Sequence, residues 1–482
     1  MSTPPVHPLT DDATTAERPA AGATPAADTA VVVLAAGQGT RFRSDTAKVL
    51  HRAAGRSLVG HVLEAARPLG FGQVVVVVGH QADAVRAEVE GLGVANLTTV
   101  VQHEQRGTGH AVQQAMPAIA PGIERVVVLA GDTPLLTSRW LEALLAATTD
   151  APAAMLTAVL DDPTGYGRVL RGPSGTVDRI VEHKDATDDE RTVAEINAGM
   201  YAVAHDLLVD ALGRLDDDNA QGEIYLTDVV GILTGDGRPV AAIVAPEDVV
   251  AGVNDRAQLA AAATELRRAR LHHLMTEVGV TIIDPASTHL DADVEVGRDA
   301  VLLPNTILES GTRIGARAVV GPNTHLSNCT VGDDATVHST RGVDAVVGDG
   351  ADVGPFAHLR AGTLLGARTK VGAYVETKNA AVGDGSKIPH LSYVGDATIG
   401  ADVNVACGVI TVNYDGRTKA HTTIEDGAFV GCDTMLVAPV TVGAGAYTAA
   451  GSTITDDVPA GALAIARSRQ TVKDGWASAR RV

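Results

Sequence analysis

The sequence predicts an α/β domain, a long connecting helix and a parallel β-helix, in that order along the chain. Two observations carry this prediction. Between residues 30 and 256, apolar β-branched runs alternate with helical segments, and after residue 278 an apolar residue recurs every six positions. The length of 482 residues agrees with it, because domains usually hold about 100–200 residues.

The chain opens with residues 1–29, which we predict to be a disordered tail. The segment is rich in Thr, Ala, Pro and Asp, so it holds too little apolar surface to offset the cost of ordering. It has neither the basic start nor the apolar middle of a signal peptide.

Residues 30–256 form the predicted α/β domain. Largely apolar runs at 30–35, 73–78 and 125–129 are typical of central parallel strands that are covered on both faces. Helical segments lie between them, for example at 58–67 and 109–118. This alternation favours a Rossmann-like sandwich whose ligands bind at the carboxyl ends of the strands.

Residues 257–278 are predicted to form the connecting helix. They are rich in Ala, Leu and Arg and contain neither Gly nor Pro before Gly279. Leucines recur in this region at helical spacing, at positions 259, 266 and 274.

Residues 279–482 form the predicted β-helix. The six-residue period is clearest in two runs: Val353, Leu359, Leu365 and Val371, and then Ile424, Val430, Leu436 and Val442. Each hexapeptide would supply one flat face of a triangular coil, with its aliphatic residue inside. The period breaks between 408 and 423, which predicts an external loop, and the segment after Thr455 is expected to leave the repeat.

Composition excludes several classes of protein. Lys and Arg number 38 and Asp and Glu number 58, and the net charge of −20 argues against a nucleic-acid-binding protein. Three cysteines make a disulfide framework implausible and favour a reducing cytoplasm. No apolar run approaches the ~20 residues of a membrane span. A small anionic ligand stays possible, because local Arg and Lys clusters can bind it.

The first predicted strand runs directly into a glycine turn, Leu-Ala-Ala-Gly-Gln-Gly-Thr-Arg, at residues 34–41. Glycines let backbone N–H groups approach a phosphate, and a helix beginning after the turn would add positive potential. A plain strand-to-helix turn is the alternative. Arg41 and the nearby Lys48 favour a triphosphate site, because both bring positive charge to the turn.

This turn, followed by Lys-Val-Leu at 48–50, resembles the sugar-1-phosphate nucleotidyltransferases. Further matching motifs follow in order: Gln102–Ala111, Gly131-Asp132, Gly165–Arg168, Val181–Asp185, Glu195–Gly199 and Val253-Asn254. With the β-helix included, residues 30–475 resemble the bifunctional family that joins N-acetylglucosamine-1-phosphate uridyltransferase to glucosamine-1-phosphate N-acetyltransferase activity. The resemblance implies a nucleotidyltransferase domain and a left-handed β-helix of hexapeptide repeats.

By this resemblance, the first domain binds UTP, N-acetylglucosamine-1-phosphate and Mg²⁺. Arg41 and Lys48 would promote catalysis by neutralising phosphate charge. Asp132 and Asn254 would hold the metal, with phosphate oxygens and water completing its shell. The resemblance assigns substrate contacts to Leu34, Ala35, Ala36, Gly37, Lys48, Gln102, Gly107, Thr108, Ala130, Gly131, Asp132, Gly167, Glu182, Asn197 and Asn254. Among them Gln102, Gly107 and Thr108 would contact uracil.

The β-helix would carry the acetyltransferase site. His390 is the expected general base, because an ammonium must lose a proton before it attacks a thioester. Arg360, Lys378, Tyr393 and Asn404 would bind the sugar phosphate. Acetyl-CoA would lie along Cys407, Asn413, Tyr414, Cys432, Ala450 and Arg467. Family members of this fold assemble as trimers, so a homotrimer is expected.

Three functions therefore stay open. The leading one is a cytoplasmic bifunctional enzyme that makes UDP-N-acetylglucosamine for cell-envelope precursors such as peptidoglycan. An alternative is a nucleotidyltransferase with one activity, similar to ADP-glucose or GDP-mannose enzymes, whose β-helix is structural. The third is a scaffold that binds sugar nucleotides without catalysis. The polar set in the β-helix argues against the second, and intact Arg41, Lys48, Asp132 and Asn254 argue against the third.

Overall fold

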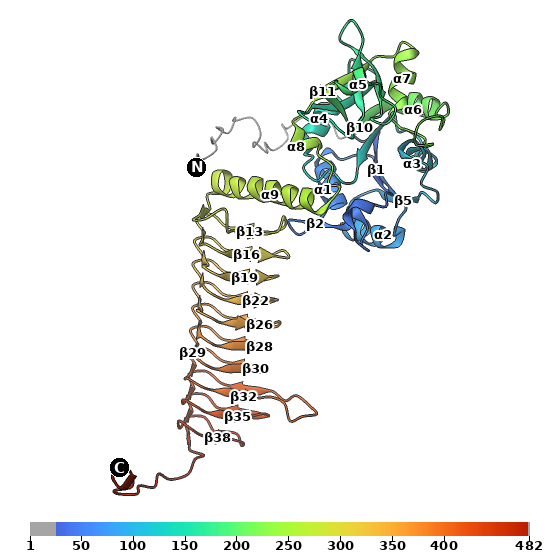
Figure 1. The fold of residues 1–482 in the computed structure, drawn as a ribbon. Coiled ribbons are helices and arrows are strands. Elements are labelled where there is room, and N and C mark those ends of the chain that lie inside the picture. The colour runs from blue at the N-terminus through green and yellow to red at the C-terminus, as the bar shows by residue number, and fades with distance from the viewer. Residues whose placement is uncertain (1–25, 481–482) are drawn as a thin grey trace, which may run out of the picture. The chain divides into compact units, whose positions relative to one another are not determined.

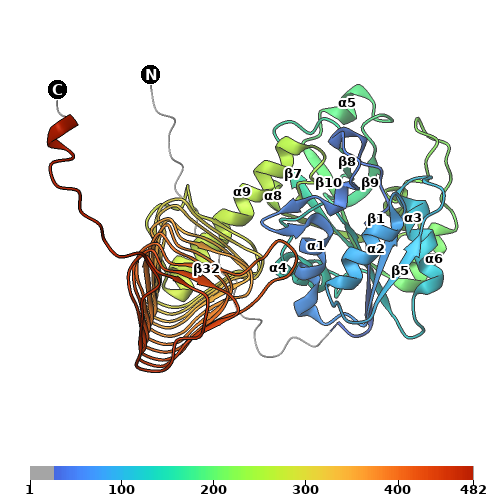
Figure 2. The same ribbon diagram turned by 90° about the horizontal axis from the view of Figure 1, so that it is seen from below.

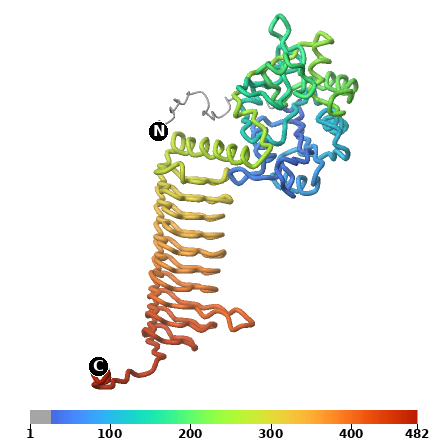
Figure 3. The backbone as a smooth tube through the Cα atoms, in the orientation of Figure 1, coloured from blue at the N-terminus to red at the C-terminus, as the bar shows by residue number. Residues whose placement is uncertain are grey.

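A computed structural model describes residues 26–480 of the chain. The chain divides into two compact units, with the division between Leu266 and Arg267. This boundary falls inside the long helix α9 (Arg256–His273), which a π-helical turn, Leu274–Val278, extends (Figure 3). The predicted tail lies outside the described residues up to position 25. Its last part is ordered, because Ala26 donates a backbone hydrogen bond to Leu69 and Thr29 begins the first strand.

The first unit is an α/β sandwich built on a nine-stranded sheet (Figure 1). Its main strands, in spatial order, are β11 (Val240–Val244), β7 (Ala153–Val159), β10 (Glu195–Ala204), β6 (Arg125–Ala130), β1 (Thr29–Ala35), β4 (Gln73–Val78) and β5 (Leu97–Val101). Strand β1 runs parallel to both β4 and β6, whereas β10 is antiparallel to β6 and β7. The predicted central parallel strands are therefore confirmed.

Helices cover both faces of this sheet. They are α1 (Leu58–Ala66), α2 (Ala82–Gly91), α3 (Thr108–Ala115), α4 (Ser138–Ala147), α6 (His205–Leu212) and α7 (Asp228–Gly235). Consecutive residues of β1 belong to different cores: Val31 and Val33 pack on one face and Val32 packs on the other, all fully buried. Two-sided burial explains why the strand is apolar without alternation.

One local expectation is wrong. The glycine turn after β1 leads into a 3-10 helix of three residues, Thr40–Phe42, and not into an α-helix. A single turn has almost no macrodipole. Positive charge at this turn therefore comes from side chains.

The second unit is a parallel β-helix with a triangular cross-section (Figure 2). Equivalent strands of successive coils pair in parallel: Val353 faces Val371, which faces Ile388, and Val405 faces Val430. All five side chains are buried. The predicted hexapeptide residues thus form the inner column, and the β-helix is confirmed. No helix within residues 26–480 has the length and hydrophobicity to span a bilayer.

Seven strands of this unit carry the residues discussed below. They are β28 (Glu376–Val382), β29 (Lys387–His390), β30 (Tyr393–Ile399), β31 (Asn404–Val405), β32 (Ile410–Val412), β33 (Thr422–Ile424) and β34 (Phe429–Val430). The predicted external loop connects β32 to β33 and projects from the coil (Figure 1).

The repeat also continues further than predicted. Strand β39 (Leu463–Ala464) pairs in parallel with β37 (Tyr447–Thr448), and Val458 bridges to Val442. Val458 follows Val442 by 16 positions, whereas equivalent valines 353 and 371 are 18 apart. The shortened coil breaks the six-residue period in the sequence but leaves the strand pairing intact.

Candidate active sites

A cavity of about 440 Å³ opens where β1 and β6 end in the first unit. Most of the predicted nucleotide and sugar contacts line it: Leu34, Ala36, Gly37, Lys48, Gln102, Gly107, Thr108, Ala130, Asp132, Glu182 and Asn197. Predicted residues outside this lining are Ala35, Arg41, Gly131, Gly167 and Asn254. Ala35 belongs to the core, and Arg41 lies exposed on the 3-10 turn.

Two of the remaining residues support the wall through their backbones. Gly131 donates a hydrogen bond to the Leu34 carbonyl at 3.0 Å, and a Cβ at Gly131 would lie 2.8 Å from that oxygen. The Gly167 carbonyl accepts a hydrogen bond from the Asn197 N–H at 2.9 Å. Glycine at position 131 therefore permits the close approach of two strand ends that the cavity needs.

The centre of the cavity holds a cation between two oxygen donors. The Lys48 ammonium forms an ion pair with Asp132 and lies 3.1 Å from Asn254 Oδ1. Gly39 makes room for this lysine, because it has a positive φ of 62° and a Cβ there would lie 2.6 Å from Lys48 Cβ. The packing of Lys48 on the turn thus requires Gly39.

The two oxygen donors come from segments far apart in sequence. Val253 donates a backbone hydrogen bond to the Asp132 carbonyl at 2.9 Å, which brings Asn254 beside Asp132. Asp255 accepts the Gln258 N–H at the start of α9, so the Asn254 side chain is not needed as a cap. A carboxylate and an amide oxygen that already converge on a cation are a donor set that suits Mg²⁺. The described residues contain no cluster of three His, Cys, Asp or Glu that could hold a metal ion.

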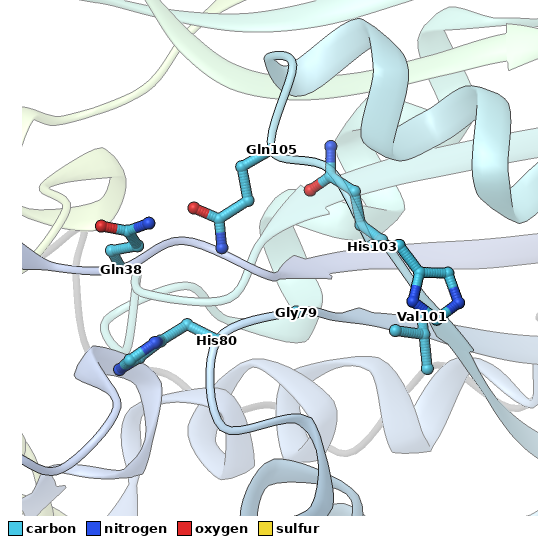
Figure 4. Close-up of a pocket in the computed structure, with 7 residues that line it drawn as sticks. Gln38, Gly79, His80, Val101, His103 and Gln105 are labelled. Carbon is cyan, nitrogen blue, oxygen red and sulfur yellow. The ribbon is translucent and has the colours of Figure 1, made fainter.

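At Gln102 and Gln105 the cavity continues into a polar hollow of about 290 Å³ (Figure 4). Gln38, His80 and Gln105 gather on one side of it, and His103 lies on the other. Gln102 lines both spaces and is 4% exposed. The sequence analysis missed Gln105, whose Nε2 donates to the Ala36 carbonyl at 2.7 Å and so ties this wall to the glycine turn.

The opposite end offers polar groups suited to a sugar. Glu182 accepts a hydrogen bond from Thr227 Oγ1 at 3.1 Å, and burial raises the pKa of this carboxyl. Asn197 accepts the Gly199 N–H at 3.0 Å. Tyr201, which the sequence analysis missed, lines the cavity with a buried hydroxyl that has no hydrogen-bond partner among residues 26–480. An unpaired buried hydroxyl is costly, so a ligand that pairs with it gains affinity.

Four of the predicted acetyltransferase residues meet in the second unit. Lys378 pairs in register with Gly395 on the next coil, and the hydroxyl of Tyr393 covers Gly395 at the place of a Cβ. Asn413 Nδ2 lies 3.5 Å from that hydroxyl and also bonds to Asp396. Arg360 forms an ion pair with Glu376 at 2.8 Å on an adjacent coil.

A fifth residue joins this group from the external loop. Lys419 bridges back to Tyr414, and its ammonium lies so close to Lys378 that it lowers the pKa of Lys378. Two ammonium groups side by side form a site that an anion would stabilise. The sequence analysis missed Lys419, because five loop residues separate it from Asn413.

A second set of predicted residues stacks along one corner of the coil. Gly408 N–H donates to the His390 carbonyl, Asp433 N–H to Cys407 and Gly451 N–H to Cys432. This aligns His390, Cys407, Cys432 and Ala450 on successive coils. Cys432 is exposed and Cys407 is half-buried, whereas burial raises the pKa of the Cys329 thiol.

Within residues 26–480, no side-chain hydrogen bond joins this corner to the Lys378 group. Asn404 lies apart from the Lys378 group, because it pairs with Phe429 and with Lys387, which begins the strand β29 that ends at His390. Tyr414 is 57% exposed on the external loop, and Arg467 follows the last strand. One chain therefore presents the predicted acetyltransferase residues as separate patches.

Comparison with known proteins covers both units. Residues 31–228 match the MobA-like NTP transferase domain. Relatives named "Bifunctional protein GlmU" match nearly the whole chain: the protein of Streptomyces avermitilis is 52% identical over 460 residues, 94% of each chain. That of Corynebacterium efficiens is 50% identical over 458 residues, 94% of each chain. That of Exiguobacterium sibiricum is 51% identical over 449 residues, 92% of this chain and 99% of its own.

Proposed function

The chain belongs to the bifunctional GlmU family, and from this premise we propose that it makes UDP-N-acetylglucosamine by two reactions at two sites. The second unit acetylates glucosamine-1-phosphate, and the first unit joins the product to UMP. The observation that carries this proposal is that each unit holds its own cluster of polar residues. Lys48, Asp132 and Asn254 converge in one, and Lys378 and Lys419 in the other.

In uridyl transfer, a phosphate oxygen of N-acetylglucosamine-1-phosphate attacks the α-phosphorus of UTP. A new P–O bond forms, the bond to the β-phosphate breaks, and pyrophosphate leaves. Mg²⁺ held by Asp132 and Asn254 would neutralise phosphate charge. Lys48 then exchanges its carboxylate partner for a phosphate, and Arg41 adds a second cation. Positioning and charge neutralisation supply the catalysis, without a covalent intermediate.

Uracil is expected at Gln102, Gly107 and Thr108, and the N-acetylglucosamine at Glu182, Asn197 and Gly167. The glycine turn would support the triphosphate between them.

In acetyl transfer, His390 takes a proton from the substrate ammonium. The freed amine attacks the thioester carbonyl of acetyl-CoA, a C–N bond forms, and the C–S bond breaks to release CoA. The sugar phosphate is bound by Lys378, Lys419 and Arg360, whose charges match a phosphate dianion. Tyr393 and Asn404 provide further polar contacts, and acetyl-CoA extends along the corner of Cys407, Cys432 and Ala450, with Asn413, Tyr414 and Arg467.

We further propose a homotrimer in which neighbouring chains complete the acetyltransferase site. The corner that carries His390 also exposes an apolar column. Phe356 and Tyr374 stack there with ring centroids 5.2 Å apart, and these two side chains and Leu391 are more than half exposed. Contiguous exposed apolar surface of this kind marks an interface. A second copy would cover the column and bring its own residues beside His390.

Both co-substrates are cytoplasmic metabolites, and the three cysteines are free thiols, so we place the enzyme in the cytoplasm.

One incubation tests the whole proposal. The purified chain is mixed with glucosamine-1-phosphate, acetyl-CoA, UTP and Mg²⁺, while CoA release and pyrophosphate release are followed separately. Both products are expected. Pyrophosphate release from UTP when N-acetylglucosamine-1-phosphate is supplied, without any acetylation, would establish the alternative with one activity. The absence of both products would indicate a scaffold.

The external loop provides a direct test of the phosphate site. Lys419→Ala removes one of two adjacent ammonium groups. The KM for glucosamine-1-phosphate should therefore rise roughly 10- to 100-fold, which corresponds to the loss of one hydrogen bond to a charged group. Arg417→Ala is the matched control, because this cation lies on the same loop. An equal rise in KM for both variants would assign the effect to the loop and not to Lys419.

The cysteine positions predict selective inhibition by a maleimide. Cys407 and Cys432 are accessible on the corner proposed for acetyl-CoA, so an adduct should block acetylation, spare uridyl transfer and be prevented by prior acetyl-CoA. Rates of both reactions after stoichiometric labelling measure this. Equal sensitivity of the Cys407→Ser/Cys432→Ser variant would contradict the assignment.

A further inference from the structure

A chain of hydrogen bonds behind the base end of the nucleotide cavity involves a residue without an assigned role. Gln102 Nε2 lies 3.1 Å from the Gly107 carbonyl and 3.1 Å from His110 Nδ1. His110 lies in the first turn of α3, and its other ring nitrogen is 3.2 Å from the Gln114 side-chain amide. All three side chains are buried or half-buried.

The carbonyl in this chain determines the orientation of the Gln102 amide. A carbonyl oxygen only accepts hydrogen bonds, so the group of Gln102 that faces Gly107 must be the NH₂. Its second hydrogen then points to His110 Nδ1, which must be unprotonated. Both hydrogens of the amide are used, and Oε1 has no hydrogen bond within residues 26–480. Gln102 therefore offers the cavity an acceptor only.

This differs from the simplest view of an amide that pairs with uracil through both its donor and its acceptor. Uracil presents a donor at N3–H, and cytosine presents an unprotonated N3 that accepts. An amide held with Oε1 toward the base accepts a hydrogen bond from uracil N3–H but repels the lone pair of cytosine N3. An amide that is free to turn would serve both bases.

We propose that His110 is a positioning residue that selects uracil over cytosine by holding Gln102 in its acceptor orientation. This inference rests on the proposed uridyl transfer and adds a residue to its specificity. Two fixed partners, Gly107 and His110, restrain the amide more tightly than one. Position 107 must be glycine for this arrangement, because its φ is 105° and a Cβ would lie 2.5 Å from the Ile224 carbonyl.

The test compares two polar substitutions of matched character. Asn in His110→Asn places an amide oxygen near the former Nδ1, so it can still accept from Gln102. The longer side chain of His110→Gln places its amide near the former Nε2 and leaves Gln102 with one partner. The ratio of kcat/KM for UTP to kcat/KM for CTP is measured with N-acetylglucosamine-1-phosphate. We expect His110→Asn to retain the wild-type ratio within about twofold and His110→Gln to lower it about five- to tenfold.

A double-mutant cycle separates this role from general packing. Gln102→Ala should lower the same ratio, and adding His110→Gln to it should lower the ratio no further, because His110 acts through Gln102. Acetylation by the same preparations reports folding. An unchanged ratio in His110→Gln, or additive losses in the double variant, would overturn the inference. A wild-type chain that releases no pyrophosphate from UTP would instead refute the proposed uridyl transfer.

Discussion

Asp132→Ala is expected to abolish uridyl transfer, with a loss of at least about a thousandfold, and to leave acetyl transfer near the wild-type rate. Within residues 26–480, the variant removes the only carboxylate that pairs with Lys48, and with it the charged ligand proposed for Mg²⁺. Asp132 and the proposed acetyltransferase residues lie in separate compact units, so damage at Asp132 should leave the acetyltransferase residues in place. Pyrophosphate release and CoA release from the same sample measure the two effects.

Asp132→Asn is the matched control for this result. It preserves the size of the side chain and an oxygen donor but removes the negative charge. It should retain more uridyl transfer than Asp132→Ala, and its activity should require a higher Mg²⁺ concentration. A parallel loss of acetylation in a folded Asp132→Ala protein would contradict the assignment of the two reactions to separate sites.

The fold was predictable where the sequence pattern and the burial coincide. The runs at 30–35, 73–78 and 125–129 lie within strands that are covered on both faces, and the inner column of the β-helix is the six-residue repeat itself. The last coil escaped prediction because it is two residues shorter than the coil from Val353 to Val371, although its strands still pair. A search for a fixed six-residue period misses a shortened coil, whereas the strands of that coil can still pair with their neighbours.

The residues of the candidate sites were predictable where they follow the ends of neighbouring parallel strands. Asp132 and Gly37 follow parallel neighbouring strands, so topology alone brings them together. Lys419 and Tyr201 depend on tertiary contacts. A loop of hydrogen bonds around Asp415 and Thr418 returns Lys419 to the coil, and no periodicity encodes that return. The unpaired hydroxyl of Tyr201 becomes visible only once its buried surroundings are known.

The hydrogen bonds of Gln102 show a further limit to predicting a binding site from sequence. The residue type predicts an amide that can donate and accept, but its neighbours Gly107 and His110 take up the donor. What a polar side chain offers a ligand depends on the hydrogen bonds it already makes.

His390→Ala should lower acetyl transfer by about 10²- to 10⁴-fold, the usual contribution of a positioned general base, with uridyl transfer unaffected. His390 ends strand β29 and is exposed at the corner that also carries Cys407 and Cys432, where the thioester is proposed to lie. No described side chain pairs with its imidazole, so removing the ring leaves no buried partner unsatisfied. The fold should therefore survive the substitution.

The pH dependence of this variant distinguishes a base from a structural histidine. Without His390 the substrate amine must lose its proton to solvent, so the acetylation rate of His390→Ala should rise steeply with pH as the free amine accumulates. The wild-type rate should rise less steeply with pH, because His390 removes the proton within the complex. His325→Ala, which removes a histidine paired with Glu309 elsewhere on the coil, is the control and should keep the wild-type profile. A His390→Ala rate that is low at every pH, with no steeper rise than the wild type, would show that His390 positions the substrate and does not accept its proton.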